Sequence, residues 1–205
     1  MFGGGIILLK RVIEFFRVLG ELRYLIPVMR YKFPDPDDPA SLAHTFQDTT
    51  NRFAERPFLY FEDEMWTYAD TNKAANILAT YLTSTGVKHG DRIVLFMENR
   101  PSFVISLLAL NKIGAIAVLI NTSLTGDPLI HCINSSDSIK CIVGAERADV
   151  LEEVLHKINI TKQEDFLWAE DTSQYSLPGW AIDLNAQLDS FDDKNLEETN
   201  SVRAK

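Results

Sequence analysis

Cysteine and histidine are scarce in this chain of 205 residues. The two cysteines, Cys132 and Cys141, stand in apolar surroundings, which favours buried reduced thiols over a disulfide or a metal site with ligands at ordered spacing. The four histidines are scattered, and His131 cannot act as a base toward Cys132, because adjacent residues of a helix do not face each other. The sequence therefore predicts no catalytic residue and no metal ligand.

A glycine-rich phosphate loop is also missing. The stretch TSTGVK at 83–88 has one glycine and follows an expected helix, whereas a phosphate loop follows a strand and precedes a helix. Gly86 is therefore interpreted as the C-terminal cap of that helix. The glycines at 3–5 have no strand before them. These absences count against a small self-contained nucleotide-binding domain, the weakest of the functions considered.

Long apolar runs and an excess of positive charge are missing as well. Charges interrupt residues 6–29, IILLKRVIEFFRVLGELRYLIPVM, before they reach the roughly 20 apolar residues that a membrane span needs. The basic residues follow the short apolar run instead of preceding it, which is not the order of a signal peptide. The formal net charge of −9 argues against nucleic-acid binding.

The first 32 residues differ from the rest of the chain. They carry six Lys or Arg and two Glu, a net charge of +4, and their apolar residues recur at helical spacing opposite a charged face. We expect an amphipathic helix over 1–32 that ends or kinks at Pro27. Residues 6–29 would either lie in a membrane interface or pack on the body of a longer protein. Residues 33–40, FPDPDDPA, are expected to form a linker.

Residues 41–170 alternate between helical and strand patterns, which predicts an α/β fold with a mainly parallel sheet and flanking helices. The apolar runs at 92–97 and 115–120 are typical of strands buried on both faces. Residues 171–205 read as an irregular acidic tail. The expected strands cover 58–62, 65–68, 92–97, 115–120, 140–143 and 166–169, and the expected helices cover 41–54, 69–84, 101–112, 127–135 and 147–158.

Three polar residues follow the expected strands. Asn99 and Arg100 come after 92–97, and Asn121 comes after 115–120. Ligands of open α/β sheets bind outside the carboxyl ends of the strands, so these side chains could face a substrate or a partner subdomain. The alternative, which their local hydrogen-bonding preferences favour, is that they cap the following helices and fix the loops.

Three stretches carry a family resemblance. WTYADTNKAANILATYL at 66–82, GDRIVLFMENRPSFV at 90–104 and KIGAIAVLINTSL at 112–124 resemble, in this order, early elements of adenylate-forming (AMP-binding) enzymes. The combination of MENRPxF, INTxL and LxHC is similar to the fatty acid transport protein branch of long-chain and very-long-chain acyl-CoA synthetases. The resemblance covers roughly residues 38–170, with Ala69-Asp70 where the family has its early acidic residue.

The resemblance implies the N-terminal subdomain of the adenylate-forming fold. It also implies a reaction in which a long-chain fatty acid and ATP give an acyl-adenylate and pyrophosphate, after which coenzyme A displaces AMP, with Mg²⁺ offsetting phosphate charge. The family's Thr/Ser/Gly-rich phosphate loop and its C-terminal lysine are expected beyond the point where this sequence stops.

This chain alone is therefore expected to be inactive and to bind ATP, Mg²⁺ and coenzyme A weakly. A cytoplasmic protein with peripheral membrane association through 6–29 is expected. The alternative function is that of a non-catalytic, membrane-associated binding or scaffold relative.

Overall fold

The computed structural model describes Gly20 and residues 41–170, 174–191 and 193–194. The chain divides into two compact units, Met1–Asp38 and Pro39–Lys205, and all the helices and strands named below belong to the second unit. The predicted amphipathic helix over 1–32, with its membrane-contact segment 6–29, and the predicted linker at 33–40 lie outside the described residues, Gly20 excepted.

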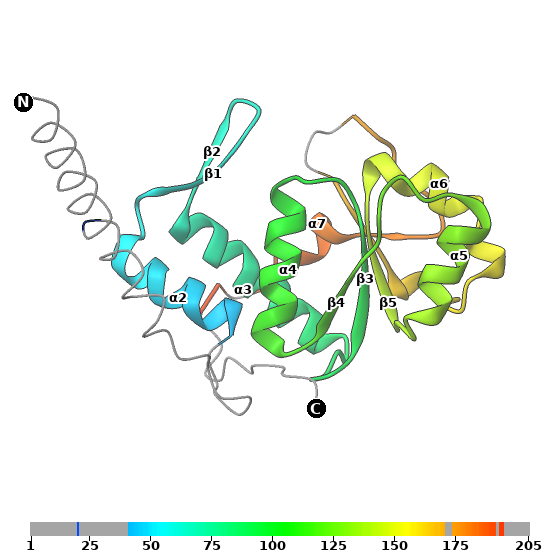
Figure 1. Ribbon diagram of the computed structural model, residues 1–205, viewed down its shortest axis with the longest axis horizontal. Helices are drawn as coiled ribbons and strands as arrows, with labels where there is room; N and C mark the ends of the chain where they lie inside the picture. The colour runs from blue at the N-terminus through cyan, green and yellow to red at the C-terminus, as the bar shows by residue number, and fades with distance from the viewer. Residues whose placement is uncertain (1–19, 21–40, 171–173, 192, 195–205) are drawn as a thin grey trace, which may run out of the picture. The chain divides into compact units, whose positions relative to one another are not determined.

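A five-stranded sheet forms the centre of this unit, in the order β4-β3-β5-β6-β7, and every pair in it is parallel. This confirms the prediction of a mainly parallel sheet. A separate antiparallel hairpin, β1-β2, stands apart from it (Figure 1). The strands are β1 (Pro57–Phe61), β2 (Glu64–Thr67), β3 (Arg92–Phe96), β4 (Ile116–Leu119), β5 (Lys140–Gly144), β6 (Phe166–Ala169) and β7 (Ile182–Asp183).

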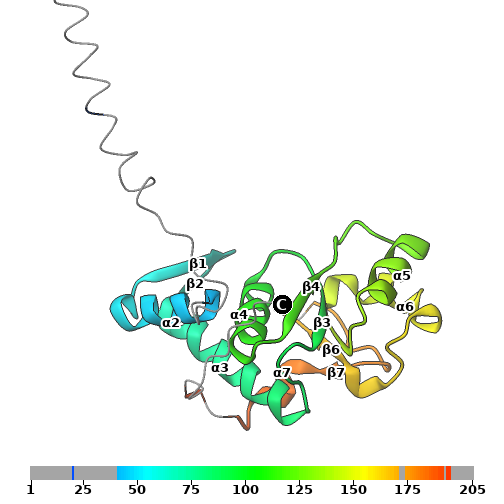
Figure 2. The ribbon, with the colours of Figure 1, turned by 60° about the horizontal axis from the view of Figure 1, so that its bottom comes forward.

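Helices cover both faces of the sheet (Figures 1 and 2). Successive side chains of a strand point to opposite faces, so Ile93 and Leu95 of β3 join one buried apolar cluster while Val94 and Phe96 join the other. The first cluster lies under α3 (Tyr68–Ser84), α4 (Pro101–Ile113) and α7 (Leu184–Leu188), and α2 (Leu42–Phe53) packs on α3 and α4. The second lies under α5 (Gly126–Ser135) and α6 (Ala148–Glu152).

The ends of α3 and α4 follow from local chemistry. The Asp70 N–H donates to Thr67 Oγ1 at 3.0 Å, while the Thr67 hydroxyl and N–H donate to the Asp70 carboxylate at 2.6 and 3.1 Å, which completes a capping box. These hydrogen bonds lower the pKa of Asp70. Helix α4 begins at Pro101, as predicted, and ends before Gly114, whose φ of 73° is left-handed.

Two predicted elements differ from the structure. Strand β4 is an edge strand, and its Leu119 is 54% exposed, so the strand is not buried on both faces. The helix predicted over 147–158 is broken into the 3₁₀ turn Ala145–Arg147, the short α6, and a second 3₁₀ turn, Leu155–Lys157. The break lets the chain extend at Ile158, so that Ile158 and Ile160 are both buried against the sheet.

The segment predicted as an irregular tail from residue 171 holds two regular elements. Strand β7 pairs with β6, with Leu167 opposite Ile182, and the Asp183 carboxylate accepts the Ala186 N–H at 3.2 Å to cap α7. Leu184 is buried in the first cluster. The sheet therefore continues past residue 170. A two-residue strand has no periodicity to read, which is why the sequence pattern did not predict it.

Candidate functional site

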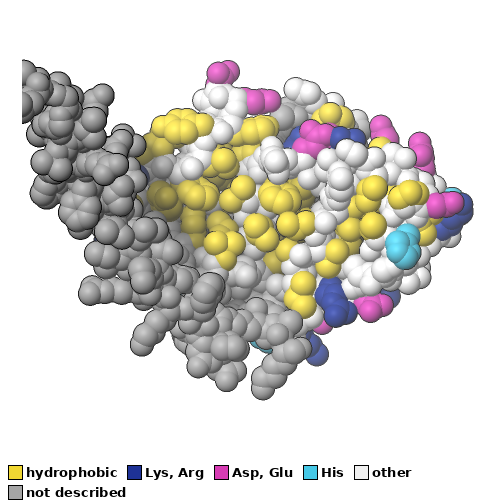
Figure 3. Space-filling model, viewed as in Figure 1, with side chains coloured by type: hydrophobic (Ala, Val, Ile, Leu, Met, Phe, Trp, Pro, Cys, Tyr) yellow, Lys and Arg dark blue, Asp and Glu magenta, His cyan; other side chains and the backbone are white. Residues whose placement is uncertain are grey.

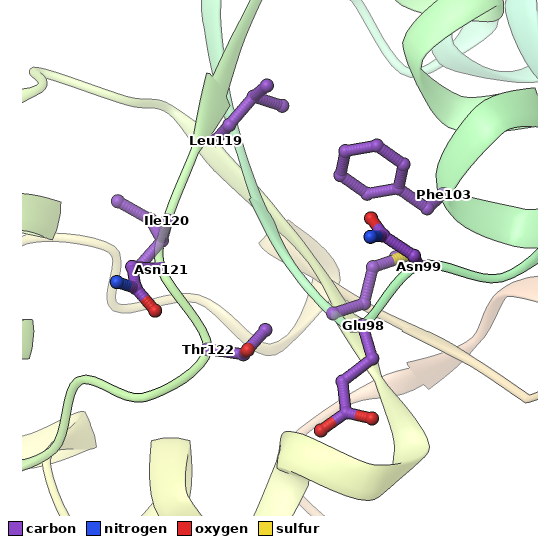
Figure 4. A pocket seen from close by; sticks show the side chains of 8 residues that line it. Glu98, Asn99, Phe103, Leu119, Ile120, Asn121 and Thr122 are labelled. Carbon is purple, nitrogen blue, oxygen red and sulfur yellow. The ribbon is translucent and has the colours of Figure 1, made fainter.

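A cleft of about 590 Å³ lies beyond the carboxyl ends of β3 and β4. Figure 4 shows Asn99 and Phe103 on one side of it and Leu119 to Thr122 on the other. Its lining residues are Met97, Glu98, Asn99, Phe103, Leu119, Ile120, Asn121 and Thr122.

The register of the sheet brings these two loops together. Leu95 lies opposite Leu119 in the parallel pair of β3 and β4, so both strands end at the same edge of the sheet. The Ile120 N–H donates to the Leu95 carbonyl at 3.0 Å and continues the pairing one residue past the end of β4. Pro101 then starts α4, whose first turn carries Phe103 to the cleft. Residues distant in the sequence therefore line one hollow, as the topology of parallel sheets requires.

Two of the three predicted site residues line the cleft. Asn99 lies on the loop after β3, and Asn121 on the loop after β4. The Asn121 Oδ1 also accepts the Ser123 N–H at 2.9 Å, which fixes its own loop. Asn121 therefore combines the two alternatives considered for it, since it lies at the cleft and stabilises a turn.

Arg100 has a different position. Its Nη1 lies 3.1 Å from Glu146 Oε2, and both side chains are only 9% exposed. The Glu98 N–H donates to Glu146 Oε1 at 2.7 Å, and Arg147 forms an ion pair with the Glu98 carboxylate. Two positive and two negative side chains thus tie the loop after β3 to the turn after β5. Arg100 is the N-cap residue of α4, yet no side-chain hydrogen bond of its own caps the helix.

Gly144 makes room for this ionic group. A Cβ at this position would lie 2.5 Å from Glu146 Oε1 and 2.6 Å from Met97 Cβ, closer than real Cβ contacts come. The carboxylate of Glu146 therefore packs directly over the end of β5. Glu146 and Arg147 were not among the residues predicted from the sequence, although their place just after a buried strand at the same sheet edge is the signal that singled out Arg100.

The groups with shifted pKa lie outside the cleft. Burial lowers the pKa of Lys112, on α4, to about 8, and its Nζ lies 3.3 Å from Gln47 Oε1 of α2. Burial raises the pKa of the Cys141 thiol, so this cysteine is an unreactive core residue, as predicted. Neither group lines the cleft.

The cleft combines an apolar wall with neutral hydrogen-bonding groups. Glu98 is the one carboxylate among its lining residues, and Arg147 binds it. No Lys or Arg lines this part of the described chain, so the charge of a triphosphate would go unmatched here. Among the described residues no group of three or more His, Cys, Asp or Glu could hold a metal ion. The donors present therefore do not fit Mg²⁺ or the phosphates of ATP.

Exposed apolar side chains lie on several elements, and one of them, Leu119, lines the cleft. Figure 3 shows hydrophobic side chains gathered over the hairpin, α4 and β4. Tyr60, Met65 and Leu119 are 70%, 51% and 54% exposed. Apolar patches of this kind mark surfaces that another protein segment or a ligand covers. None of the helices in the described part of the chain has the length and hydropathy of a membrane span.

Comparison with known proteins gives a consistent family. The family described as "AMP-binding enzyme" matches residues 46–196. The chain is 30% identical over 143 residues to long-chain fatty acid transport protein 6 of Mus musculus, a match that covers 69% of this chain and 23% of that protein. It is 36% identical over 118 residues to the medium/long-chain-fatty-acid–CoA ligase FadD6 of Mycobacterium tuberculosis, covering 58% of this chain and 20% of the ligase.

The fold has solved counterparts as well. A Mycobacterium tuberculosis fatty acyl CoA synthetase superposes with a TM-score of 0.62 and 26% sequence identity, covering 76% of this chain and 29% of that structure. The chain spans about a fifth to a quarter of the length of the transport protein and the FadD6 ligase.

Proposed function

The chain belongs to the AMP-binding enzyme family, and from that premise we propose that it is the N-terminal part of a long-chain fatty acid–CoA ligase. One observation carries the proposal. The relatives are long-chain fatty acid transport proteins and fatty-acid–CoA ligases, and the family match over residues 46–196 includes the loops that form the cleft.

In the proposed reaction, a fatty carboxylate attacks the α-phosphate of ATP and pyrophosphate leaves. The thiol of coenzyme A then attacks the acyl carbon, and AMP leaves. The described residues provide the sheet and the cleft, with Asn99 and Asn121 as candidate site-facing groups. Within the described part of the chain, the cleft has no cationic lining residue for phosphate and no free carboxylate pair for Mg²⁺. We therefore place both adenylation and metal binding in other segments of the enzyme.

The first test is the coding sequence beyond the codon for Lys205. The proposal expects a strand followed by a Thr/Ser/Gly-rich loop ending in Lys, in frame or after a frameshift. A stop codon followed by unrelated sequence would contradict the ligase proposal and favour a stand-alone binding protein.

The second test concerns the chain by itself. We expect no exchange of labelled pyrophosphate into ATP above a protein-free blank when the chain is incubated with palmitate, ATP and Mg²⁺, because no Lys or Arg of the described residues lines the cleft to match the phosphate charge. Measurable exchange that survives further purification would overturn the assignment of adenylation to other segments.

We also propose that residues 6–29 attach the protein to the cytoplasmic side of a membrane. Their basic amphipathic pattern supports this, since such helices bind anionic lipid surfaces. Sedimentation with liposomes containing anionic lipid should bring down the full chain and leave a variant lacking residues 1–32 in solution. Equal sedimentation of the two proteins would remove the membrane proposal and leave the ligase proposal intact.

A further inference from the structure

A second cavity, of about 320 Å³, lies on the α3 and α4 face of the sheet and shares no lining residue with the cleft. Segments far apart in the sequence form it, since β2, α3 and the first turns of α4 meet Glu170 and α7 there. Its volume is that of a small-molecule site. Its walls are mainly apolar, and the apolar residues that line it are Trp66, Ala74, Leu78, Ile105, Leu184 and Leu188.

A buried hydroxyl without a partner also lines this cavity. Ser106 of α4 is 1% exposed, and its Oγ makes no hydrogen bond within the described residues. The neighbouring helix behaves differently, because Thr80 and Thr83 of α3 each donate to the carbonyl four residues earlier, at 2.9 Å. A buried polar group normally has a partner. The Ser106 hydroxyl is therefore suited to a hydrogen bond with a bound molecule.

The charges around the cavity favour a particular ligand class. Glu64 and Glu170 line it, and no Lys, Arg or His of the described chain does. Glu170 Oε1 accepts the Tyr175 N–H at 2.8 Å, and within the described residues no hydrogen bond engages its second oxygen. The amino end of α4 contributes roughly half a positive charge, which is less than two carboxylates carry. An anion is disfavoured, whereas a cationic donor would be bound.

We propose that this cavity binds a small primary amine with an apolar body. The amino group would donate to Glu170 and to the Ser106 hydroxyl, and the hydrocarbon would lie against the apolar walls. The two carboxylates of this site disfavour the fatty carboxylate of the proposed ligase reaction. The amine-binding proposal therefore does not depend on the ligase proposal.

The test uses the full chain with hexylamine, hexanol and hexanoate at pH 7, followed by NMR chemical-shift titration. We expect hexylamine to bind with a Kd on the order of 1 mM, as befits a ligand of so few atoms. Hexanol should bind more weakly, and hexanoate should cause no shift. Binding of hexanoate as tight as that of hexylamine, or no binding of the amine at 20-fold the expected Kd (about 20 mM), would overturn the proposal.

Two variants separate a binding role from a structural one. Glu170→Gln keeps an acceptor for Tyr175 but removes the charge, and should weaken hexylamine binding about tenfold. Ser106→Ala should weaken it about fivefold while leaving the melting temperature unchanged or raised, because a buried hydroxyl without a partner is removed. Thr80→Ala is the control and should leave the affinity unchanged. Unchanged affinity in both Glu170→Gln and Ser106→Ala would contradict the proposal.

Discussion

The two faces of the sheet are covered by helices of different kinds. On one face, α3 and α4 are regular helices of 17 and 13 residues with defined ends. On the other, α5 has 10 residues, and the chain after β5 has a five-residue helix between 3₁₀ turns. The strands contribute buried side chains to both faces, since successive residues of β3, β5 and β6 alternate between the two clusters. Tight burial therefore does not require long helices.

The largest expected losses of stability come from one Leu→Ala substitution in the apolar core on each face of the sheet, and the two can be compared directly. Leu82 of α3 and Leu151 of α6 are both 0% exposed. Replacing either by Ala should lower the free energy of unfolding by about 3 kcal/mol, because each change leaves a cavity in a packed core. Denaturant unfolding followed by circular dichroism would measure both. A loss below about 1 kcal/mol for Leu151→Ala would show that the face with short helices repacks freely.

Gly144→Ala tests the contact between the end of β5 and the ionic group beside the cleft. The new methyl group would collide with Met97 and the Glu146 carboxylate, and should cost about 2 kcal/mol in denaturant unfolding. Gly179→Ala is the matched control, since no atom lies within 4 Å of its added Cβ. Equal stability of the two variants would mean that Glu146 moves aside without cost.

Lys112 lies on the face of the sheet that α3 and α4 cover, and it tests how a buried charge affects stability there. Its pKa is lowered to about 8 by burial, below its ordinary value of 10.5. Between these values the unfolded chain binds more protons than the folded one, so this residue makes stability rise with pH from about 8 to 10.5. Lys112→Met should be more stable than the parent by on the order of 1 kcal/mol at pH 7.

The stability advantage of Lys112→Met should shrink as the pH rises to 10, which parallel urea titrations at pH 7, 8.5 and 10 would measure. A difference that does not change with pH would show that the ammonium group is solvated in the folded protein.

The smallest effect concerns the start of α3. Thr67→Ala removes the capping box and should cost about 1 kcal/mol. Thr49→Ala is the control, since the Thr49 hydroxyl donates to the Thr45 carbonyl of its own helix, and this change should alter stability little. Because the pKa of Asp70 is lowered, its contribution is present above the ordinary value of 3.8 and is lost as the pH falls below it. A cost for Thr67→Ala as large at pH 2 as at pH 7 would contradict this account, because only the Asp70 N–H bond to Thr67 Oγ1 is independent of the carboxylate charge.

Local signals predicted the regular part of the fold well. Pro101 and Gly114 set the ends of α4, and Ser41 caps α2, with its Oγ accepting the His44 N–H at 3.1 Å. The stretch at 66–82 was noted only for its family resemblance, and the structure adds a capping box at Thr67. The capping box gives a local role to Asp70 of the Ala69-Asp70 pair that departs from the family pattern, because Asp70 is the residue that closes it.

The site was less predictable. Strand order could not be read from the apolar runs at 92–97 and 115–120, so nothing in the sequence distinguished the central β3 from the edge strand β4. Asn99 and Asn121 were found because carboxyl ends of parallel strands share an edge. Arg100 was grouped with them, but its partner Glu146 lies 46 positions away and is brought close only by the pairing of β3 with β5.

The sequence by itself determined the family, the alternation of helices and strands, and the ends of the capped helices, since these depend on neighbours within a few residues. Tertiary structure decided which strand lies at the edge and where the chain after β5 breaks its helix. It also decided that β7 and α7 complete the sheet and the second cavity. Those outcomes depend on contacts between distant segments, whose burial outweighs local propensity.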